Sequence, residues 1–187
     1  MNAPLTAEHV AAAFGRRTGP VAALAVDADA LAAACHAMAE RFGRGGRLLA
    51  LGSGPAAADA AHVVVEFVHP VIVGKRALPA LALPDGGSAA TVALFGNPDD
   101  IALAFSPDGA SPVLADAMAA AARGGLLTVA LLGGDGGAVA AGPPLDHVIT
   151  IPSDDRRVVR EAHVTAYHVL WELVHVFLEA QGKGGRP

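Results

Sequence analysis

Three groups of residues in this sequence have side chains and spacings that suit acid–base, metal or anion-binding chemistry. His62 and Glu66 lie four residues apart in an apolar segment, so a helix would present both on one face. A histidine nitrogen and a carboxylate oxygen at this spacing can share a metal ion or a hydrogen bond. Near the end of the chain, His168 follows Arg160 by eight residues. This is a little over two helical turns, so these two can also share a face.

Both observations have an ordinary interpretation as well. A single histidine–carboxylate pair at this spacing is most often a surface pair, and a histidine in an apolar helix is more often a core or interface residue. We assign His163 and His175 to that class. His62 and Glu66 stand apart because they lie one to two turns into a helix that follows a glycine-rich turn.

The third group consists of three turns that each lead into a predicted helix. They are Gly52-Ser53-Gly54-Pro55, Asp85-Gly86-Gly87-Ser88 and the segment from Ser106 to Ser111. Free N–H groups at a helix start favour anions, so these turns indicate a phosphorylated small molecule, although ordinary turns are equally compatible with the pattern. The first turn lacks the GxGxxG spacing, because Ala57 occupies the third glycine position, and this disfavours a dinucleotide.

Alternating strands and helices must position these residues. The apolar runs do not alternate with polar residues, which is typical of parallel strands buried on both faces. We predict an α/β fold, with a five-stranded, parallel, doubly wound, flavodoxin-like sheet preceded by an N-terminal helical hairpin. Ligands of such sheets bind beyond the carboxyl ends of the strands. The predicted strands are 48–51, 77–83, 101–106, 126–132 and 147–151, and the predicted helices are 5–17, 20–43, 56–69, 87–95, 111–123, 136–141 and 156–181.

The composition bounds the class of protein. The 187 residues suit a single domain over 1–187, with the hairpin in 1–45, the sheet core in 46–152 and the closing helix in 153–182. Hydrophobic residues make up 53%, which opposes disorder. A net charge of −5 without a basic cluster disfavours nucleic acid. With one cysteine, Cys35, and neither a signal peptide nor a long apolar run, we expect a cytoplasmic protein without a membrane span.

Taken in order, three segments resemble the sugar isomerase (SIS) family, and within it the sedoheptulose 7-phosphate isomerases. GRLLALGSGPAAADAAHVVVEF is similar to the family's strand, glycine-rich turn and helix with a His-x-x-x-Glu pair. FSPDGASPVLADAM is similar to its serine-rich phosphate segment. REAHVTAYHVLWELVH is similar to its closing helix, which carries a glutamine and, eight residues later, a histidine. The resemblance implies aldose–ketose isomerisation of sedoheptulose 7-phosphate to a heptose 7-phosphate.

The resemblance also implies roles for individual residues. Glu66 would be the base and His168 the acid, and zinc would be held by both together with His62. Such isomerases assemble as homotetramers with composite sites, so the closing helix can serve a neighbouring subunit. The substrate-binding residues implied for the sugar phosphate are Ser53, Ser106 and Ser111 for the phosphate and Asp85 and Asn97 for sugar hydroxyls, with Arg160 available for a substrate anion.

This sequence departs from the family pattern at several places. Arg160 stands where the family has its glutamine ligand, and a guanidinium is not a usual zinc ligand. It could instead pair with Glu66 or bind a substrate anion. Pro55 and Ala56 alter the first turn, and Pro107 and Asp108 alter the phosphate segment. A family helix is also missing where Gly96-Asn97 runs almost directly into the next strand.

These departures leave alternatives open. The first is a catalytic isomerase or a related metal-dependent sugar enzyme. The second is a non-catalytic SIS protein that binds a sugar phosphate or a protein partner in an assembly or regulatory role.

Overall fold

Five parallel strands form the centre of the computed structural model, which describes residues 6–184. Their order is β2-β1-β3-β4-β5, so the flavodoxin-like prediction is confirmed. The order reverses between β1 and β3, where Leu48 pairs with Ile101. The strands are β1 (Leu48–Leu51), β2 (Ala80–Ala82), β3 (Ile101–Ser106), β4 (Leu127–Gly133) and β5 (His147–Ile151).

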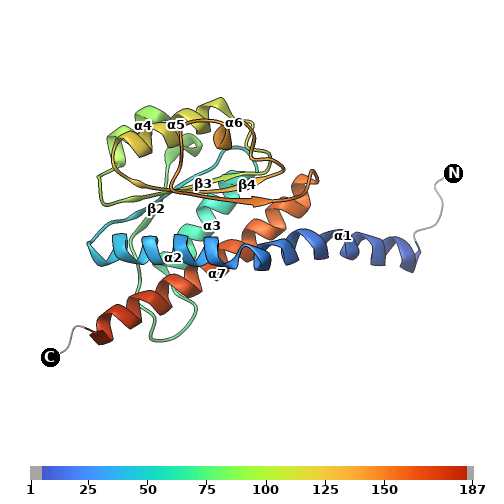
Figure 1. The fold of residues 1–187 in the computed structure, drawn as a ribbon, viewed down its shortest axis with the longest axis horizontal. Coiled ribbons are helices and arrows are strands. Elements are labelled where there is room, and N and C mark those ends of the chain that lie inside the picture. Colours follow the sequence, from blue (N-terminus) through green and yellow to red (C-terminus); the bar gives the residue numbers. More distant parts are fainter. Residues whose placement is uncertain (1–5, 185–187) are drawn as a thin grey trace.

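Two layers of helices cover the sheet (Figure 1). Leu48 of β1 packs into the core beneath one layer, and the next residue, Leu49, packs into the core beneath the other. Strands buried on both faces in this way need apolar residues at every position, which explains their unbroken apolar runs. One layer contains α2 (Ala28–Gly43), α3 (Ala56–Val68) and α7 (Arg156–Gly184), and the other contains α4 (Ala89–Phe95), α5 (Pro112–Arg123) and α6 (Gly137–Ala140).

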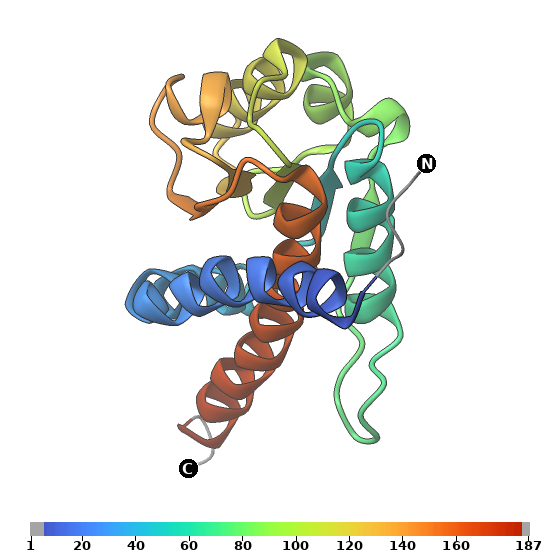
Figure 2. The same cartoon turned by 90° about the vertical axis from the view of Figure 1, so that its right-hand side faces the viewer.

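The N-terminal helices differ from the predicted hairpin. α1 (Ala7–Val26) continues through Pro20, and the break comes at Asp27. Proline removes one helical hydrogen bond, and the carbonyl that it frees, that of the exposed Arg16, can be hydrated. α1 and α2 meet at a bend of 64° and follow one another along one side of the molecule, where both cross α7 (Figures 1 and 2). The hairpin is therefore wrong, and its predicted first residue, Leu5, lies outside the described residues.

The same two helices bear on whether a segment is long and apolar enough to cross a membrane. Within residues 6–184, no single helix is both long and apolar enough to cross a membrane. α1 and α2 meet the length and composition criteria only when taken together across their bend.

Other boundaries shift by a few residues. β2 is shorter than the predicted 77–83 because it is an edge strand that pairs only with β1 and lies between Pro79 and Pro84. A 3-10 turn, η1 (Pro84–Gly86), precedes α4, whose start is capped by the Ser88 side chain. The chain then passes from α4 directly into β3, without the additional helix of the resembling family.

A buried aspartate fastens the amino ends of β1 and β3. Asp100 is 2% exposed and accepts hydrogen bonds from the Arg47 backbone N–H at 2.8 Å, the Arg47 guanidinium at 2.9 Å and the Asn97 backbone N–H at 3.0 Å. Burial alone would raise the pKa of Asp100, but the bonds from Arg47 and Asn97 outweigh it and hold that pKa below its ordinary value.

Replacing this carboxylate should weaken the fold. We expect Asp100→Ala to lower the free energy of unfolding by about 2–3 kcal/mol, because buried donors lose their acceptor. The contribution of Asp100 should be complete above about pH 4 and be lost as the pH falls through its lower folded-state pKa. Urea unfolding across this pH range measures both effects. Asp99→Ala is the control, because its carboxylate is 57% exposed and should change little.

Candidate functional site

A cavity of about 700 Å³ lies where the strand order reverses between β1 and β3. The turns that follow these strands form one side of it, and the first turns of α7 form the other. Its volume is typical of small-molecule sites, and its place is the one expected for ligands of doubly wound sheets. Four of the predicted substrate-binding residues line it together, namely Ser53, Ser106, Ser111 and Arg160.

The loop after β3 is held rigid by its own polar groups. The Ser106 hydroxyl accepts from the Gly109 N–H at 2.9 Å and donates to Asp108 at 3.3 Å. Gly109 has a φ of +62°, and a Cβ there would lie 1.9 Å from the carbonyl oxygen of Gly136. No side chain fits at this position. Ser111 caps α5 by accepting from the Leu114 N–H at 3.3 Å, which leaves its hydroxyl proton available to an anion.

Asp108 does not leave an uncompensated negative charge in this loop. Its carboxylate forms an ion pair with Arg156 and also accepts from the Ala110 N–H at 3.1 Å. Arg156 and Arg157 line the same cavity, although the sequence analysis did not single them out. Arg157 is in turn paired with Asp155, and its hydrogen bonds lower the pKa of Asp155 to about 2.

The two residues expected at sugar hydroxyls lie elsewhere. Asp85 lines an adjacent cavity of about 440 Å³, which shares Ser53 with the larger one. Asn97 precedes β3 and therefore lies at the amino end of the sheet, where its amide donates to Asp100 at 3.3 Å. Asn97 thus does not join the cavity, because the carboxyl ends of the strands form the opposite edge of the sheet.

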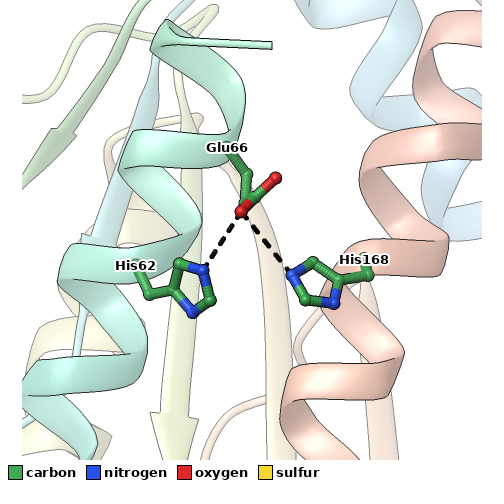
Figure 3. Close-up of side chains that lie close together, drawn as sticks. All are labelled: His62, Glu66 and His168. Atoms are coloured by element: carbon green, nitrogen blue, oxygen red, sulfur yellow. Dashed lines mark hydrogen bonds and ion pairs between the residues drawn. The ribbon is translucent and has the colours of Figure 1, made fainter. Parts of the chain in front are cut away.

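The predicted acid–base residues do come together, from α3 and α7 (Figure 3). Glu66 Oε1 lies 3.1 Å from His62 Nε2 and 3.6 Å from His168 Nε2. The Glu66 side chain is 12% exposed, whereas those of His62 and His168 are 46% and 45% exposed. One carboxylate oxygen therefore faces two imidazoles that remain open to a ligand.

The same three residues fit a metal ion. One donor atom from each lies within 4.8 Å of the others. Two histidine nitrogens and one carboxylate oxygen match the donor set of catalytic zinc sites, which keep a position open for water or substrate. None of the three is in the wall of the cavity. Asp59 and Val164, about one turn before His62 and His168, are the nearest wall residues along the two helices.

A tyrosine completes this group of side chains. Tyr167 is fully buried, and its hydroxyl lies 2.5 Å from His62 Nδ1. Burial, followed by the charges of Asp59 and Glu66, raises the pKa of Tyr167 above its ordinary value, so the hydroxyl keeps its proton. The sequence analysis passed over this residue, although it is the only tyrosine of the chain and directly precedes His168.

Arg160 pairs with a residue that the sequence analysis also passed over. Its guanidinium donates to both carboxylate oxygens of Asp59, at 2.9 and 3.1 Å, and not to Glu66. Asp59 is 4% exposed. A signal was present in the sequence, since Asp59, His62 and Glu66 follow the i, i+3, i+7 spacing of one helical face.

Two histidines assigned to the core are confirmed there. His163 is fully buried and His175 is 2% exposed. Burial lowers the pKa of His163 to about 4, so it is neutral in the folded protein at physiological pH.

Comparison with known proteins identifies the family. No protein-family model matches the chain. It is 36% identical over 169 residues to a phosphoheptose isomerase of Solidesulfovibrio magneticus, covering 82% of this chain and 81% of that protein. The chain belongs to the phosphoheptose isomerase family. Another family member, from Chlorobaculum parvum, is 37% identical over 168 residues, covering 79% of this chain and 78% of that one.

The solved structures agree with this assignment. A phosphoheptose isomerase from Francisella tularensis superposes with a TM-score of 0.79 at 25% identity, covering 91% of this chain and 99% of that one. The resemblance derived from the residues is therefore confirmed at the level of family and fold. Arg160 stands where the resemblance leads us to expect a glutamine, so its pairing with Asp59 is tested separately.

Arg160→Gln should destabilise the protein by about 2–3 kcal/mol, because it leaves the buried Asp59 carboxylate without a partner. Adding Asp59→Asn should recover part of that loss, since the second change removes the unpaired charge. Guanidinium unfolding of the wild type, both single variants and the double variant gives the coupling energy. Arg157→Gln, which removes an exposed pair on the same helix, is the control. A coupling energy near zero would contradict a role for the pair.

Proposed function

We propose that this protein is an aldose–ketose isomerase of phosphorylated sugars, with sedoheptulose 7-phosphate as the leading substrate. The observation that carries the proposal is the position of Glu66 Oε1 between His62 and His168, next to a cavity at the strand switch. Membership of the phosphoheptose isomerase family supports the choice of reaction and substrate.

Two residues divide the proton transfers. Glu66 takes the proton from the carbon beside the carbonyl and returns it to the neighbouring carbon. His168 moves the second proton between the two substrate oxygens, so that the aldose and ketose differ only in the places of two hydrogens. A carboxylate can accept the proton from carbon, and an imidazole can both donate and accept one, so the two side chains suit these steps.

We propose zinc as the cofactor, held by His62, Glu66 and His168. When bound, it would polarise the sugar oxygens and stabilise negative charge that develops on them. The support is the donor set and the 4.8 Å limit on the distances between donor atoms. The charge of Arg160 is already neutralised by Asp59, so it does not oppose a cation nearby.

The phosphate would bind in the larger cavity. Ser53 and the free hydroxyl proton of Ser111 provide the donors. Ser106 helps by holding the loop in place, because its hydroxyl is already used there. Asp85, which lines the adjacent cavity, would meet a sugar hydroxyl.

We also propose that the protein works as a homo-oligomer, with a tetramer suggested by the sequence resemblance, in the cytoplasm. α1 supports assembly, because none of its 20 residues is buried and Phe14 on it is 70% exposed. The half-exposed His62 and His168 lie outside the cavity of their own chain. A neighbouring subunit could therefore complete the site.

Glu66→Gln should abolish most isomerisation. The substitution keeps the size of the side chain but removes the base, so we expect turnover to fall by about 10²- to 10⁴-fold. The assay follows the interconversion of sedoheptulose 7-phosphate and the aldose phosphate. Glu172→Gln, an exposed change on α7, is the matched control and should leave turnover unchanged.

Binding separates the proposal from its alternative. Sugar phosphate should raise the melting temperature of the wild type and of Glu66→Gln equally, because the variant retains the phosphate site. Binding without turnover in the wild type would favour a non-catalytic sugar-phosphate sensor. Absence of both binding and turnover would contradict the phosphate site itself.

Metal content tests the cofactor independently of substrate. Protein purified without chelator should contain about one zinc per chain, as expected for a catalytic-type set of three protein ligands. His62→Ala and His168→Ala should each lose it, whereas His36→Ala, an exposed change on α2, should keep it. Elemental analysis gives the ratio. If zinc is absent from the wild type even after incubation with the ion, the proposed cofactor is wrong.

A further inference from the structure

Tyr167 connects the two helices that carry the candidate acid–base residues. Its ring is fully buried and packs edge-to-face against Phe105, with the ring centroids 5.8 Å apart. The hydroxyl extends from α7 to His62 on α3, where it lies 2.5 Å from Nδ1. The packing of the ring thus determines where the hydroxyl meets the imidazole.

The two ring nitrogens of His62 have different partners. Nδ1 faces the Tyr167 hydroxyl, and Nε2 faces Glu66 at 3.1 Å. A neutral imidazole carries a proton on only one of these nitrogens. Because an ionised carboxylate can only accept, the Glu66 contact is a hydrogen bond only when Nε2 carries the proton. Nδ1 must then accept from the tyrosine.

Metal binding requires the opposite arrangement. The Nε2 lone pair must face the ion, so the ring proton moves to Nδ1. A carbonyl or carboxylate at Nδ1 would suit only this second arrangement, since neither can donate. A phenolic hydroxyl suits both, because it donates to Nδ1 in one state and accepts from Nδ1–H in the other.

We propose that Tyr167 is a positioning residue that holds the His62 ring in one orientation in either tautomer and so lets the ring exchange a bond to Glu66 for a bond to a metal ion. The metal part of this inference rests on the proposed function, whereas the orientation part does not. Tyr167 itself touches neither substrate nor metal, and it acts through His62.

The alternative is that Tyr167 only fills the core and His62 merely satisfies its buried hydroxyl. The two roles differ in what Tyr167→Phe changes. Loss of a packing role would affect stability alone. Loss of a positioning role would also remove the hydrogen bond at His62 Nδ1 and release the orientation of the ring, which stability measurements do not report.

Nitrogen-15 NMR of the metal-free full-length protein reads the tautomer directly. In alkaline buffer, at about pH 8.5, the wild type should show His62 protonated on Nε2. The His62 signals are assigned by their loss in His62→Asn. In Tyr167→Phe the Nδ1 signal should move to that of a nitrogen without a hydrogen bond, while Phe105→Leu, which disturbs the same packing but keeps the hydroxyl, should retain the wild-type pattern. An unchanged Nδ1 signal in Tyr167→Phe would overturn the proposal, as would an Nδ1–H tautomer in the wild type.

Zinc titration supplies the second readout. Tyr167→Phe should bind zinc about 10- to 100-fold more weakly than the wild type, the usual effect of removing a partner of a ligating histidine. Phe105→Leu should bind it as the wild type does. Equal affinity in Tyr167→Phe and wild type would overturn the metal part of the inference while leaving the zinc site intact. If the wild type binds no zinc, the proposed cofactor fails, and the NMR experiment still decides the role of Tyr167.

Discussion

The ion pair between Asp59 and Arg160 fixes α3 against α7, and the candidate site depends on that placement. A carboxylate that is 4% exposed is stable only with a partner, and a bidentate guanidinium satisfies both of its oxygens in one geometry. In that geometry Tyr167 reaches His62, and His168 reaches Glu66. All three contacts join the same two helices. Only loss of the Asp59–Arg160 pair would leave a buried charge without a partner.

The pair also explains how an arginine is compatible with a metal site. In the resembling family the corresponding position holds a neutral glutamine, and a permanent cation there would repel a metal ion through Coulomb interaction. Asp59 lies on the same helical face as His62 and Glu66 and is paired with Arg160. Its negative charge therefore offsets the positive charge of Arg160 near the candidate metal ligands. The site thus keeps three candidate ligands and a balanced charge around them.

The sequence predicted the sheet well because its strands are determined by local composition. The bounds of β1, β3 and β5 agree with the prediction, since buried apolar runs that end in turns leave few alternatives. The N-terminal hairpin was wrong because proline usually ends a helix, whereas exposure allows α1 to tolerate Pro20.

In the site, spacing along each helix placed His62 beside Glu66 and aligned Arg160 with His168. It could not identify the partner of Arg160 or the role of Tyr167, because both depend on how closely α3 approaches α7. That distance results from packing across the whole helical layer. Asn97 is a different case, because its place directly before β3 puts it at the amino edge of the sheet, away from the cavity.

The close approach of Gly109 to Gly136 has a mechanical consequence. A Cβ at Gly109 would overlap the Gly136 carbonyl, and the Gly109 carbonyl accepts from the Val139 N–H at 3.1 Å. The loop after β3 and the start of α6 therefore touch without any compressible side chain between them. A displacement of this loop would therefore be transmitted to the start of α6, because no side chain between the two segments can absorb it.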